Sequence, residues 1–339
     1  MSPRTIFLLA CFPASLALAD DPTPRPTMGR ITRDDPALDA LLAPDAQLEV
    51  LASGLDWSEG PCWLPDRKAV VFSDVPANHV LQWKEGEGLS VFLKPSGYTG
   101  LGSYSREPGS NGLALHPSGQ LAFCEHGDRR ISILTRNGGK RTLADHFDGK
   151  RFNSPNDLCF DREGHCYFTD PPYGLPGGPG DTTVRELPWN GVYRIDSDGK
   201  VSLLTKEMTF PNGIALSPDQ KTLYVAQSDG KAALWKAFPI LPDRSLGPSR
   251  IVANVTEMAA SGKYKGGCDG LKVDTAGNLW ATGPGGVHIM SPDGKRLGLI
   301  ETFLPNGNCC FGDDGSTLYI CADAFLCRIR TKTKGCGFP

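Results

Sequence analysis

The sequence predicts an all-β protein with the architecture of a six-bladed β-propeller. Three observations support this prediction: a β-hairpin pattern that recurs six times, the lack of any sustained helical periodicity, and an abundance of turn residues. The 339 residues include 40 Gly and 28 Pro, which are scattered between short apolar runs along the chain. Such punctuation is typical of many short strands joined by tight turns.

Each copy of the repeat begins with a polar residue, usually Asn followed by Gly, and continues as a short apolar strand, a turn and a second β-rich strand. Successive copies start 39 to 57 residues apart, which brackets the roughly 40–50 residues of a four-stranded propeller blade. Further hairpin patterns between the copies, such as residues 192–204, supply two more strands per blade. The six copies span residues 59–74, 111–125, 156–170, 212–227, 269–283 and 308–323.

Closure of the ring requires a strand from one end of the chain to complete the blade at the other end. Four-stranded units of this kind cannot bury their own faces, so six of them are expected to stack around an axis. We expect residues 47–52 to join the last blade beside residues 326–331. Two stacked β-sandwiches would explain the strands but not six similar repeats. The propeller is therefore predicted over residues 45–333, followed by a short tail at 334–339.

The beginning of the chain has the features of a secretory signal. Arg4 is basic, residues 6–18 are mostly apolar, and residues 17–19 form an Ala-Leu-Ala cleavage pattern. A lipoprotein site at Cys11 is the alternative, although it leaves a very short apolar segment. We therefore predict a signal peptide at 1–19 and an exported protein, periplasmic or secreted, with no membrane span. Residues 20–44, rich in Pro and Asp, are expected to form a poorly structured lead or a wrap on the outer surface.

Charge and cysteine content narrow the classes of partner. The 35 basic and 38 acidic residues give a net charge of −3, so nucleic acid and anionic lipid are not expected partners. Ten cysteines follow the signal segment, and none forms the C-x-x-C pair of a zinc or redox site. We expect them to be mainly small buried hydrophobic residues, with one or two disulfides. A small molecule is the expected partner, and the sequence does not predict the oligomeric state.

The leading residues of the six repeats are the candidate metal ligands. The first strand of each propeller blade lines the channel, so these residues should converge on one mouth. They are Glu59, Asn111, Asn156, Asn212, Asp269 and, in the irregular sixth copy, Asn308 or Gly307. A ring of carboxylate and amide oxygens predicts a central divalent-cation site. The alternative is that Asn-Gly and Asp-Gly are turn dipeptides, which five aligned copies make less favourable.

One divalent cation at this ring would best match Ca²⁺, because hard oxygen ligands dominate. Zn²⁺, Mn²⁺ and Mg²⁺ are alternatives, although thiolates and imidazoles are absent from the leading positions. Such a cation polarises a carbonyl oxygen and stabilises a developing oxyanion, as hydrolysis of an ester or lactone requires. Asp269 or Glu59 would accept the proton of the attacking water.

Other hydrolytic machinery is missing from the sequence. It contains no G-x-S-x-G elbow, no H-E-x-x-H helix and no G-x-x-x-x-G-K-[ST] loop. His126 is retained as a candidate substrate contact because it ends a second strand and opens a loop. An ordinary position in a surface loop explains it equally well.

Six short motifs, in this order, resemble the gluconolactonase/regucalcin (senescence marker protein) family over about residues 47–331. They are SEGP (58–61), GSNGL (109–113), NSPNDL (153–158), TDPPYG (169–174), FPNG (210–213) and CDGL (268–271). The Asp-Pro-Pro-Tyr-Gly stretch is more similar to the bacterial gluconolactonase branch than to regucalcin itself. The resemblance implies a six-bladed propeller with one divalent cation, usually calcium, in its channel.

The resemblance also implies roles for individual residues. Glu59, Asn212 and Asp269 would be the main ligands, Asn156 a ligand or a contact of substrate and water, and Asp269 the catalytic base. The repeat pattern indicates the same four positions independently. Asn308 is predicted not to be a ligand, because the sixth repeat is irregular.

The predicted substrate is a sugar lactone, and one departure from the family concerns its binding. An arginine that binds substrate in regucalcin, two residues before the Asn156 position, is Ser154 here, and Arg151 is the candidate replacement. The predicted substrate-binding residues are Asn111, Arg151, Asn156, His126 and Tyr173.

Two long loops, residues 98–110 and 171–188, are expected to follow second strands and to form a rim or lid over the mouth. The competing functions are a paraoxonase-like arylesterase and a non-catalytic, calcium-stabilised propeller that binds a ligand or a protein. The acid pair Glu59 and Asp269 in an otherwise amide ring favours catalysis.

Overall fold

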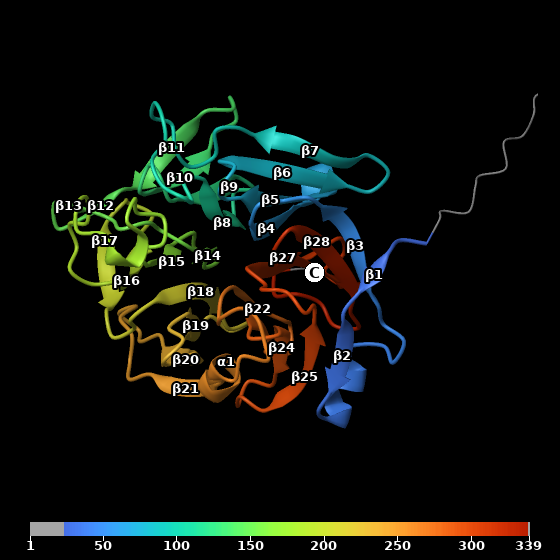
Figure 1. Ribbon diagram of the computed structural model, residues 1–339. Coiled ribbons are helices and arrows are strands. Elements are labelled where there is room, and N and C mark those ends of the chain that lie inside the picture. Colours follow the sequence, from blue (N-terminus) through green and yellow to red (C-terminus); the bar gives the residue numbers. More distant parts are fainter. Residues whose placement is uncertain (1–23, 338–339) are drawn as a thin grey trace, which may run out of the picture.

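The computed structural model describes residues 24–337, which form six β-sheets around a central channel (Figure 1). The fold is the predicted six-bladed β-propeller. The predicted signal peptide at 1–19 lies outside the described residues. Within residues 24–337, no helix is long and apolar enough to cross a membrane.

The first three blades follow one another along the chain, and each is an antiparallel sheet whose first strand is innermost. Blade 1 consists of β4 (Ser58–Leu64), β5 (Ala69–Asp74), β6 (His79–Lys84) and β7 (Gly88–Leu93). Blade 2 consists of β8 (Ser110–Leu115), β9 (Leu121–Glu125), β10 (Arg130–Leu134) and β11 (Lys140–Ala144). Blade 3 consists of β14 (Leu158–Phe160), β15 (Cys166–Asp170), β16 (Gly191–Ile195) and β17 (Val201–Thr205).

The last three blades repeat this order and close the ring. Blade 4 consists of β18 (Pro211–Leu216), β19 (Thr222–Gln227), β20 (Leu234–Pro239) and β21 (Arg250–Asn254). Blade 5 consists of β22 (Leu271–Val273), β23 (Leu279–Gly283), β24 (Gly286–Met290) and β25 (Arg296–Glu301). Blade 6 consists of β26 (Asn308–Gly312), β27 (Thr317–Ala322), β28 (Phe325–Arg330) and β3 (Leu48–Ser53). Short additional elements are β12 (His146–Phe147), β13 (Lys150–Arg151), a helical turn α1 (Thr256–Ala260) and two 3₁₀ turns, Pro65–Arg67 and Gly178–Gly180.

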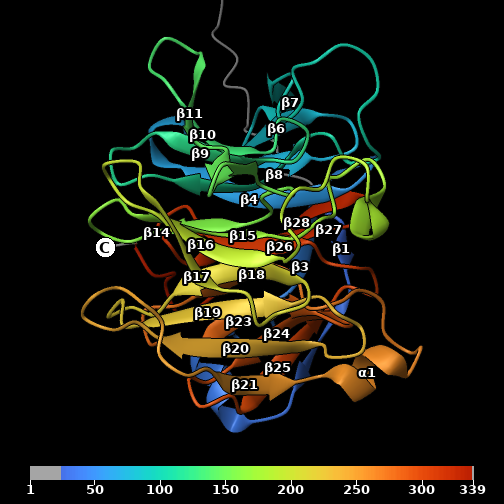
Figure 2. The ribbon, with the colours of Figure 1, turned by 90° about the vertical axis from the view of Figure 1, so that its left-hand side faces the viewer.

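Strand β3 closes the propeller by pairing with β28, with Ser53 opposite Phe325 and Glu49 opposite Arg328. The predicted pairing of the N-terminal strand with the last blade is therefore confirmed. Each inner strand also packs against the inner strands on both sides, so the contact runs around the whole ring. Figure 2 shows these strands side-on, as stacked layers.

The described segment before β3, which starts at residue 24, wraps the outside of the propeller. β1 (Thr27–Met28) extends blade 6, β2 (Arg30–Arg33) adds a fifth strand to blade 5, and a 3₁₀ turn follows at Pro36–Ala40. The expected wrap on the outer surface is therefore confirmed for these residues, and the expected poorly structured lead is wrong for them. The reason is that Leu38 is fully buried against blades 5 and 6, despite the Pro- and Asp-rich composition around it.

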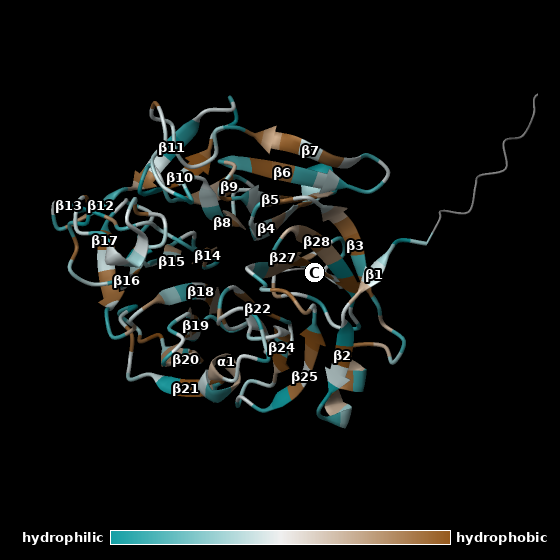
Figure 3. Cartoon of the chain, in the orientation of Figure 1, coloured by the Kyte–Doolittle hydropathy of each residue, from teal (hydrophilic) through white to brown (hydrophobic). Residues whose placement is uncertain are grey.

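The hydrophobic core lies between blades rather than within one of them. Val71 and Val80 of blade 1 pack with Phe123 of blade 2, and all three side chains are fully buried. Similar clusters fill the spaces between the other blades, and Figure 3 shows hydrophobic residues along the strands. Because each blade depends on its neighbours for burial, the ring positions its channel residues rigidly.

The ten cysteines of residues 24–337 are all free. The expected one or two disulfides are therefore wrong, whereas the interpretation as small buried hydrophobic residues is confirmed for most of them. Eight are buried, Cys159 is partly buried and Cys336 is exposed. Burial raises the pKa of the Cys62 thiol to about 12, which keeps it protonated.

Candidate functional site

The leading residues of the repeats lie at the start of the inner strands. Glu59, Asn111 and Asn212 lie within β4, β8 and β18, whereas Asn156 and Asp269 directly precede β14 and β22. Because the inner strands stand side by side around the channel, all five residues lie at the same end of it. The predicted convergence at one mouth is therefore found.

Irregular strand pairing marks the leading positions. The first two strands shift register at these points: between Glu59 and Cys62, between Ser110 and Leu113, and between Pro211 and Ile214. In blades 3 and 5, ladder pairing starts only after the leading residue. Bulges of this kind redirect side chains and are common beside active sites.

The glycine after a leading residue is required by close contact between blades. A Cβ atom at Gly112 would lie 2.7 Å from the Asn156 carbonyl oxygen, and one at Gly213 would lie 2.2 Å from that of Asp269. The N–H groups of Gly112 and Gly213 donate to these same carbonyls, at 2.7 and 3.2 Å. The interpretation of Asn-Gly as a simple turn dipeptide is thus wrong, because these pairs lie on strands and seal one blade against the next.

Hydroxyl groups from the second strands of alternate blades fix the backbone of the ring. Each donates a hydrogen bond to the carbonyl oxygen at the leading position of the next blade. The pairs are Ser73 with Asn111 at 2.9 Å, Thr169 with Asn212 at 2.7 Å and Thr282 with Gly307 at 3.0 Å. These hydrogen bonds fix the backbone of the leading positions without using their side chains, which remain available at the mouth.

The side-chain oxygens of the ring are buried and largely unused. Exposed fractions are 2% for Glu59, 3% for Asn111, 2% for Asn156 and 4% for Asn212. The Oδ1 atoms of Asn111, Asn156 and Asp269 have no hydrogen-bond partner within residues 24–337. An unsatisfied buried polar atom costs about 1–3 kcal/mol, so this ring is built for a partner outside the chain. The Asn212 amide is oriented by its Nδ2 donating to Ser228 Oγ at 2.8 Å.

Two carboxyl groups share the ring: Glu59 is buried, and Asp269 is partly exposed. Burial raises the pKa of Glu59 to about 8, with a further contribution from the carboxyl groups of Asp157 and Glu107. Burial also holds the pKa of Asp269 well above its ordinary value, and Glu59 adds to that shift. A cation would relieve both shifts, because it favours the ionised forms. The described residues contain no cluster of three or more His, Cys, Asp or Glu side chains placed for a metal, so any cation at this ring would also need amide oxygens as ligands.

The sixth position of the ring is Gly307, not the amide of Asn308. A Cβ atom at Gly307 would lie 2.7 Å from Glu59 Oε1. The Asn308 amide is already engaged, since Oδ1 accepts from Cys309 N at 2.9 Å and Nδ2 donates to Asp157 Oδ2 at 3.2 Å. This arrangement supports the prediction that Asn308 does not bind a cation.

His126 and Tyr173 lie close to the mouth. His126 is fully buried, with Nδ1 3.3 Å from the Glu107 carbonyl oxygen and Nε2 without a partner in the described chain. Burial lowers the pKa of His126 to about 4, so the ring is neutral near pH 7. The alternative of an ordinary surface-loop histidine is wrong. Burial raises the pKa of the Tyr173 hydroxyl, which lies near Asp269 and hydrogen-bonds with Ser228.

Arg151 is not part of the ring. It lies in β13, between blades 2 and 3, and its guanidinium donates to the Asp128 carbonyl oxygen. Ser154 also points elsewhere: its hydroxyl donates to the Pro171 carbonyl oxygen at 2.6 Å and accepts from Gly174 N at 2.9 Å. Ser154 therefore shapes the loop that carries Tyr173.

The two long loops have different positions in the blades. Residues 171–190 join the second and third strands of blade 3, as expected. The loop at 94–109 instead follows the outermost strand β7 and connects blades 1 and 2, so its predicted position after a second strand is wrong. Sequence reasoning also missed Glu107 in this loop, whose carboxyl group contributes to the raised pKa of both ring acids.

The other end of the channel is chemically different. A mostly apolar cavity of about 880 Å³ opens there, lined by the ends of the inner strands and the loops that follow them. Lys272 reaches it from β22, with Nζ 3.2 Å from Asn308 Oδ1 and 3.9 Å from Asp157 Oδ2. Asp157 and Lys272 were not predicted as site residues.

Fold and ring together define the class: a six-bladed β-propeller with a ring of polar side chains at one mouth of its channel. The family described as the SMP-30/Gluconolactonase/LRE-like region matches residues 57–323, and the chain belongs to this family. It is 42% identical to a gluconolactonase of Zymomonas mobilis over 91% of this chain and 88% of that protein. It is also similar to the solved structure of a gluconolactonase from Xanthomonas campestris, with 33% identity, a TM-score of 0.78, and 91% and 99% of the two chains covered. A regucalcin from Agrobacterium tumefaciens, described as calcium-binding, shares the fold at 18% identity and a TM-score of 0.65, with 84% and 94% of the two chains covered.

Proposed function

We propose that the chain is an exported, metal-dependent hydrolase that opens sugar lactones. Its place among lactone hydrolases is supported by the similarity to gluconolactonases over most of the chain. The observation that carries the chemistry is the ring itself, where two carboxyl groups and several unpartnered amide oxygens converge at a buried mouth. Export is supported by the signal pattern at residues 1–19.

One divalent cation would be held by Glu59, Asn156, Asn212 and Asp269. Ca²⁺ best suits this oxygen set, with Zn²⁺, Mn²⁺ and Mg²⁺ as alternatives. When bound, such a cation supplies Lewis acidity toward the lactone carbonyl oxygen. The unpartnered Oδ1 atoms of Asn156 and Asp269 are the structural support for this assignment.

Asp269 is the catalytic base in this proposal. Of the two ring acids, Glu59 is 2% exposed and accepts a hydrogen bond from Gly60 N at 2.7 Å, whereas Asp269 is partly open to the mouth. Water can therefore reach Asp269 more easily than Glu59. The carboxylate takes the proton of that water as the water oxygen bonds to the lactone carbonyl carbon. It returns the proton to the ring oxygen when the ring C–O bond breaks, so that this oxygen leaves as an alcohol.

Neutral hydrogen-bonding groups around the ring orient the sugar. Asn111 and Asn156 offer amide groups, and neutral His126 offers Nε2, which has no protein partner in the described chain. The protonated Tyr173 hydroxyl lies near Asp269. Polar groups of this kind select a polyhydroxylated ring over a plain alkyl lactone, because an unmatched buried polar group is costly.

Ester hydrolysis is the second candidate activity, because the same ring chemistry would act on an arylester. A diisopropyl-fluorophosphatase of Loligo vulgaris is 28% identical over 78% of this chain and 84% of that protein, so one relative is named for a non-sugar substrate. A calcium-stabilised propeller without catalysis remains the non-enzymatic alternative, in which the ring would bind an ion but nothing would be hydrolysed.

Proton release during glucono-δ-lactone hydrolysis tests these functions. The mature protein would be stripped of metal and assayed with Ca²⁺, Zn²⁺, Mn²⁺ or no addition, with phenyl acetate as the ester substrate. We expect a cation to restore lactone hydrolysis and Glu59→Ala to abolish that recovery. Cation binding without hydrolysis of any substrate would instead support the non-catalytic propeller, and activity that never depends on a cation would contradict the metal-dependent mechanism.

Cellular fractionation tests export. The full-length chain should appear outside the cytoplasm as a form shortened by the signal segment, whereas a version lacking residues 1–19 should remain inside. Equal distribution of the two versions would contradict the assignment.

A further inference from the structure

A second pocket of about 420 Å³ is formed by blade 2 together with the loop at 94–109, strand β13 and the long loop of blade 3. Its walls include Tyr98, Tyr104, Arg129 and Arg151. Gly127 also lines it and directly follows His126, whose Nε2 atom is one of the groups assigned to the substrate site. The rings of Tyr98 and Tyr104 stack with centroids 5.0 Å apart and form a flat apolar wall.

Three polar groups of this pocket lack partners. Arg129 is 6% exposed, and its Nη2 atom has no acceptor in residues 24–337, although Nε donates to the Phe152 carbonyl oxygen at 2.7 Å. Arg151 Nε and the Tyr104 hydroxyl are also buried without a partner. Unsatisfied donors of this kind are costly in a folded protein, and three around one pocket point to a ligand that accepts hydrogen bonds.

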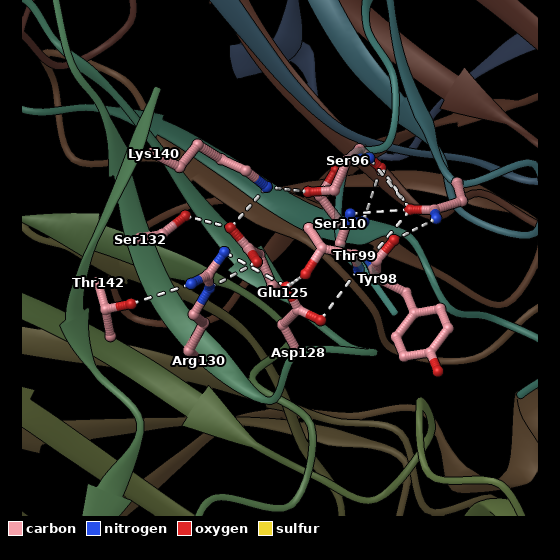
Figure 4. A network of polar contacts seen from close by, with 12 residues as sticks. Ser96, Tyr98, Thr99, Ser110, Glu125, Asp128, Arg130, Ser132, Lys140 and Thr142 are labelled. Atoms are coloured by element: carbon pink, nitrogen blue, oxygen red, sulfur yellow. Dashed lines mark hydrogen bonds and ion pairs between the residues drawn. The ribbon is translucent and has the colours of Figure 1, made fainter. Parts of the chain in front are cut away.

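Arg130 also lines this pocket, as do Asp128 and Asp145, and its guanidinium is neutralised by carboxylates of the chain. Figure 4 shows Arg130 directed at Glu125 and Thr142, and its distances to Glu125 and Asp128 carboxylate oxygens are 2.7 and 3.3 Å. Arg151, by contrast, has no carboxylate partner for its guanidinium among the described residues. For Arg129 the nearest recorded carboxylate is Glu186, at 3.8 Å. Positive charge and unused donors thus coincide at Arg129 and Arg151.

We propose that this pocket binds an oxyanion, a carboxylate or a phosphate, carried by the substrate that binds at the ring. The inference rests on the proposed lactone hydrolysis and extends it: the preferred substrates are acidic sugar lactones. Guanidinium groups bind both oxyanions through paired hydrogen bonds. The Tyr104 hydroxyl is protonated, because burial raises its pKa against the opposing effect of the two arginines, and it can donate to the same group. The tyrosine wall would cover the C–H face of the sugar.

A comparison of matched substrates tests the pocket. The probes are glucono-δ-lactone, its 6-phosphate, and D-glucaro-1,4-lactone, which carries a carboxylate. We expect Arg151→Gln to lower the ratio of kcat/KM for an acidic lactone to that for the neutral one about tenfold or more, and Tyr104→Phe to lower it less. Arg141→Gln removes an equal charge from an exposed position of the same blade and should leave the ratio unchanged. An equal loss for neutral and acidic lactones would overturn the proposal.

A binding titration separates this proposal from the proposed catalysis. Gluconate 6-phosphate, gluconate and inorganic phosphate would be titrated calorimetrically into the native protein and into Arg151→Gln. Binding of gluconate 6-phosphate that weakens at least tenfold in the variant supports the pocket even if no lactone is hydrolysed. Binding of inorganic phosphate alone would indicate a free anion as the ligand and overturn the substrate-borne group. No binding, or binding that is independent of Arg151, would also overturn it.

Discussion

The buried polar groups at two levels of the same channel differ in whether they have hydrogen-bond partners within the chain. At the mouth, Asn111, Asn156 and Asp269 keep buried oxygens without partners. Deeper in the channel, Asp157 and Lys272 are joined through the Asn308 amide by contacts of 3.2 to 3.9 Å. The deeper level is complete without a ligand, whereas the mouth is not.

The difference shows at which level of the channel an external ligand is expected to bind. At the deeper level the ammonium group of Lys272 supplies a cation from the chain itself. At the mouth, neither Glu59 nor Asp269 forms an ion pair with a lysine or arginine of residues 24–337. Burial raises the pKa of Glu59 to about 8, although the charge of Lys272 acts in the opposite direction. The raised pKa values of these acids therefore favour the external cation proposed above, and the network below them is a rigid floor.

Removal of Asp269 should have the largest effect, because it deletes the proposed base and one ligand together. We expect Asp269→Ala to reduce kcat/KM for glucono-δ-lactone by about a thousandfold or more. Tm without metal should not fall, since an uncompensated acid is removed. Proton-release kinetics and thermal unfolding would be measured on the same preparations. Asp243→Ala, an exposed site, is the matched control, and full activity in Asp269→Ala would exclude both roles.

The fold and the ring could be predicted because both follow from the sequence repeat. A polar leading residue at five similar positions predicts convergence, since inner strands of a propeller share one channel. Gly112 and Gly213 belong to the same signal, although their role in sealing blades appears only when the carbonyl oxygens of Asn156 and Asp269 are placed against them.

The floor of the site was not predicted because it breaks the repeat. Asp157 stands where four of the other five copies have Gly, and Lys272 stands where residues 112–115 and 213–216 have Ala. Those exceptions were the available signal. Arg129 could not be assigned from sequence at all, because its unpartnered Nη2 atom results from the packing of loops that are distant along the chain.

Breaking the deeper network should have the next largest effect, and on stability rather than chemistry. Lys272→Met leaves the carboxylate of Asp157 buried without its cation, since the Asp157 side chain is about 2% exposed. We expect a loss of about 3–5 kcal/mol in the free energy of unfolding, measured by urea denaturation. The double variant Lys272→Met, Asp157→Asn should recover part of this loss. If Lys272→Met were as stable as the native protein, the contact between Lys272 and Asp157 would not stabilise the deeper level, and the proposed difference from the mouth would not hold.

The pH dependence of the stability of the metal-free protein should reveal the raised pKa values of the two acids at the mouth. Folding raises the pKa of Glu59 from 4.5 to about 8 and raises that of Asp269 as well, so the folded state binds more protons than the unfolded state between these values. Stability should therefore fall as pH rises from about 4.5 to 8. Calorimetry in a chelator should show a falling Tm over this range, and added Ca²⁺ should remove the fall while releasing protons. Glu59→Gln should flatten the metal-free profile, and an unchanged slope would contradict the assignment to Glu59.

The smallest expected effect separates two asparagines at the boundary between the levels. Asn212 belongs to the mouth, whereas Asn308 is engaged by Cys309, Asp157 and Lys272. We expect Asn212→Ser to weaken Ca²⁺ binding about tenfold, and Asn308→Ser to change it by less than about threefold while costing about 1–2 kcal/mol of stability. Calorimetric titration of Ca²⁺ with parallel urea denaturation measures both quantities. If Asn308→Ser weakened Ca²⁺ binding as strongly as Asn212→Ser, the floor would itself be part of the cation site, and the division between a complete level and an open one would not hold.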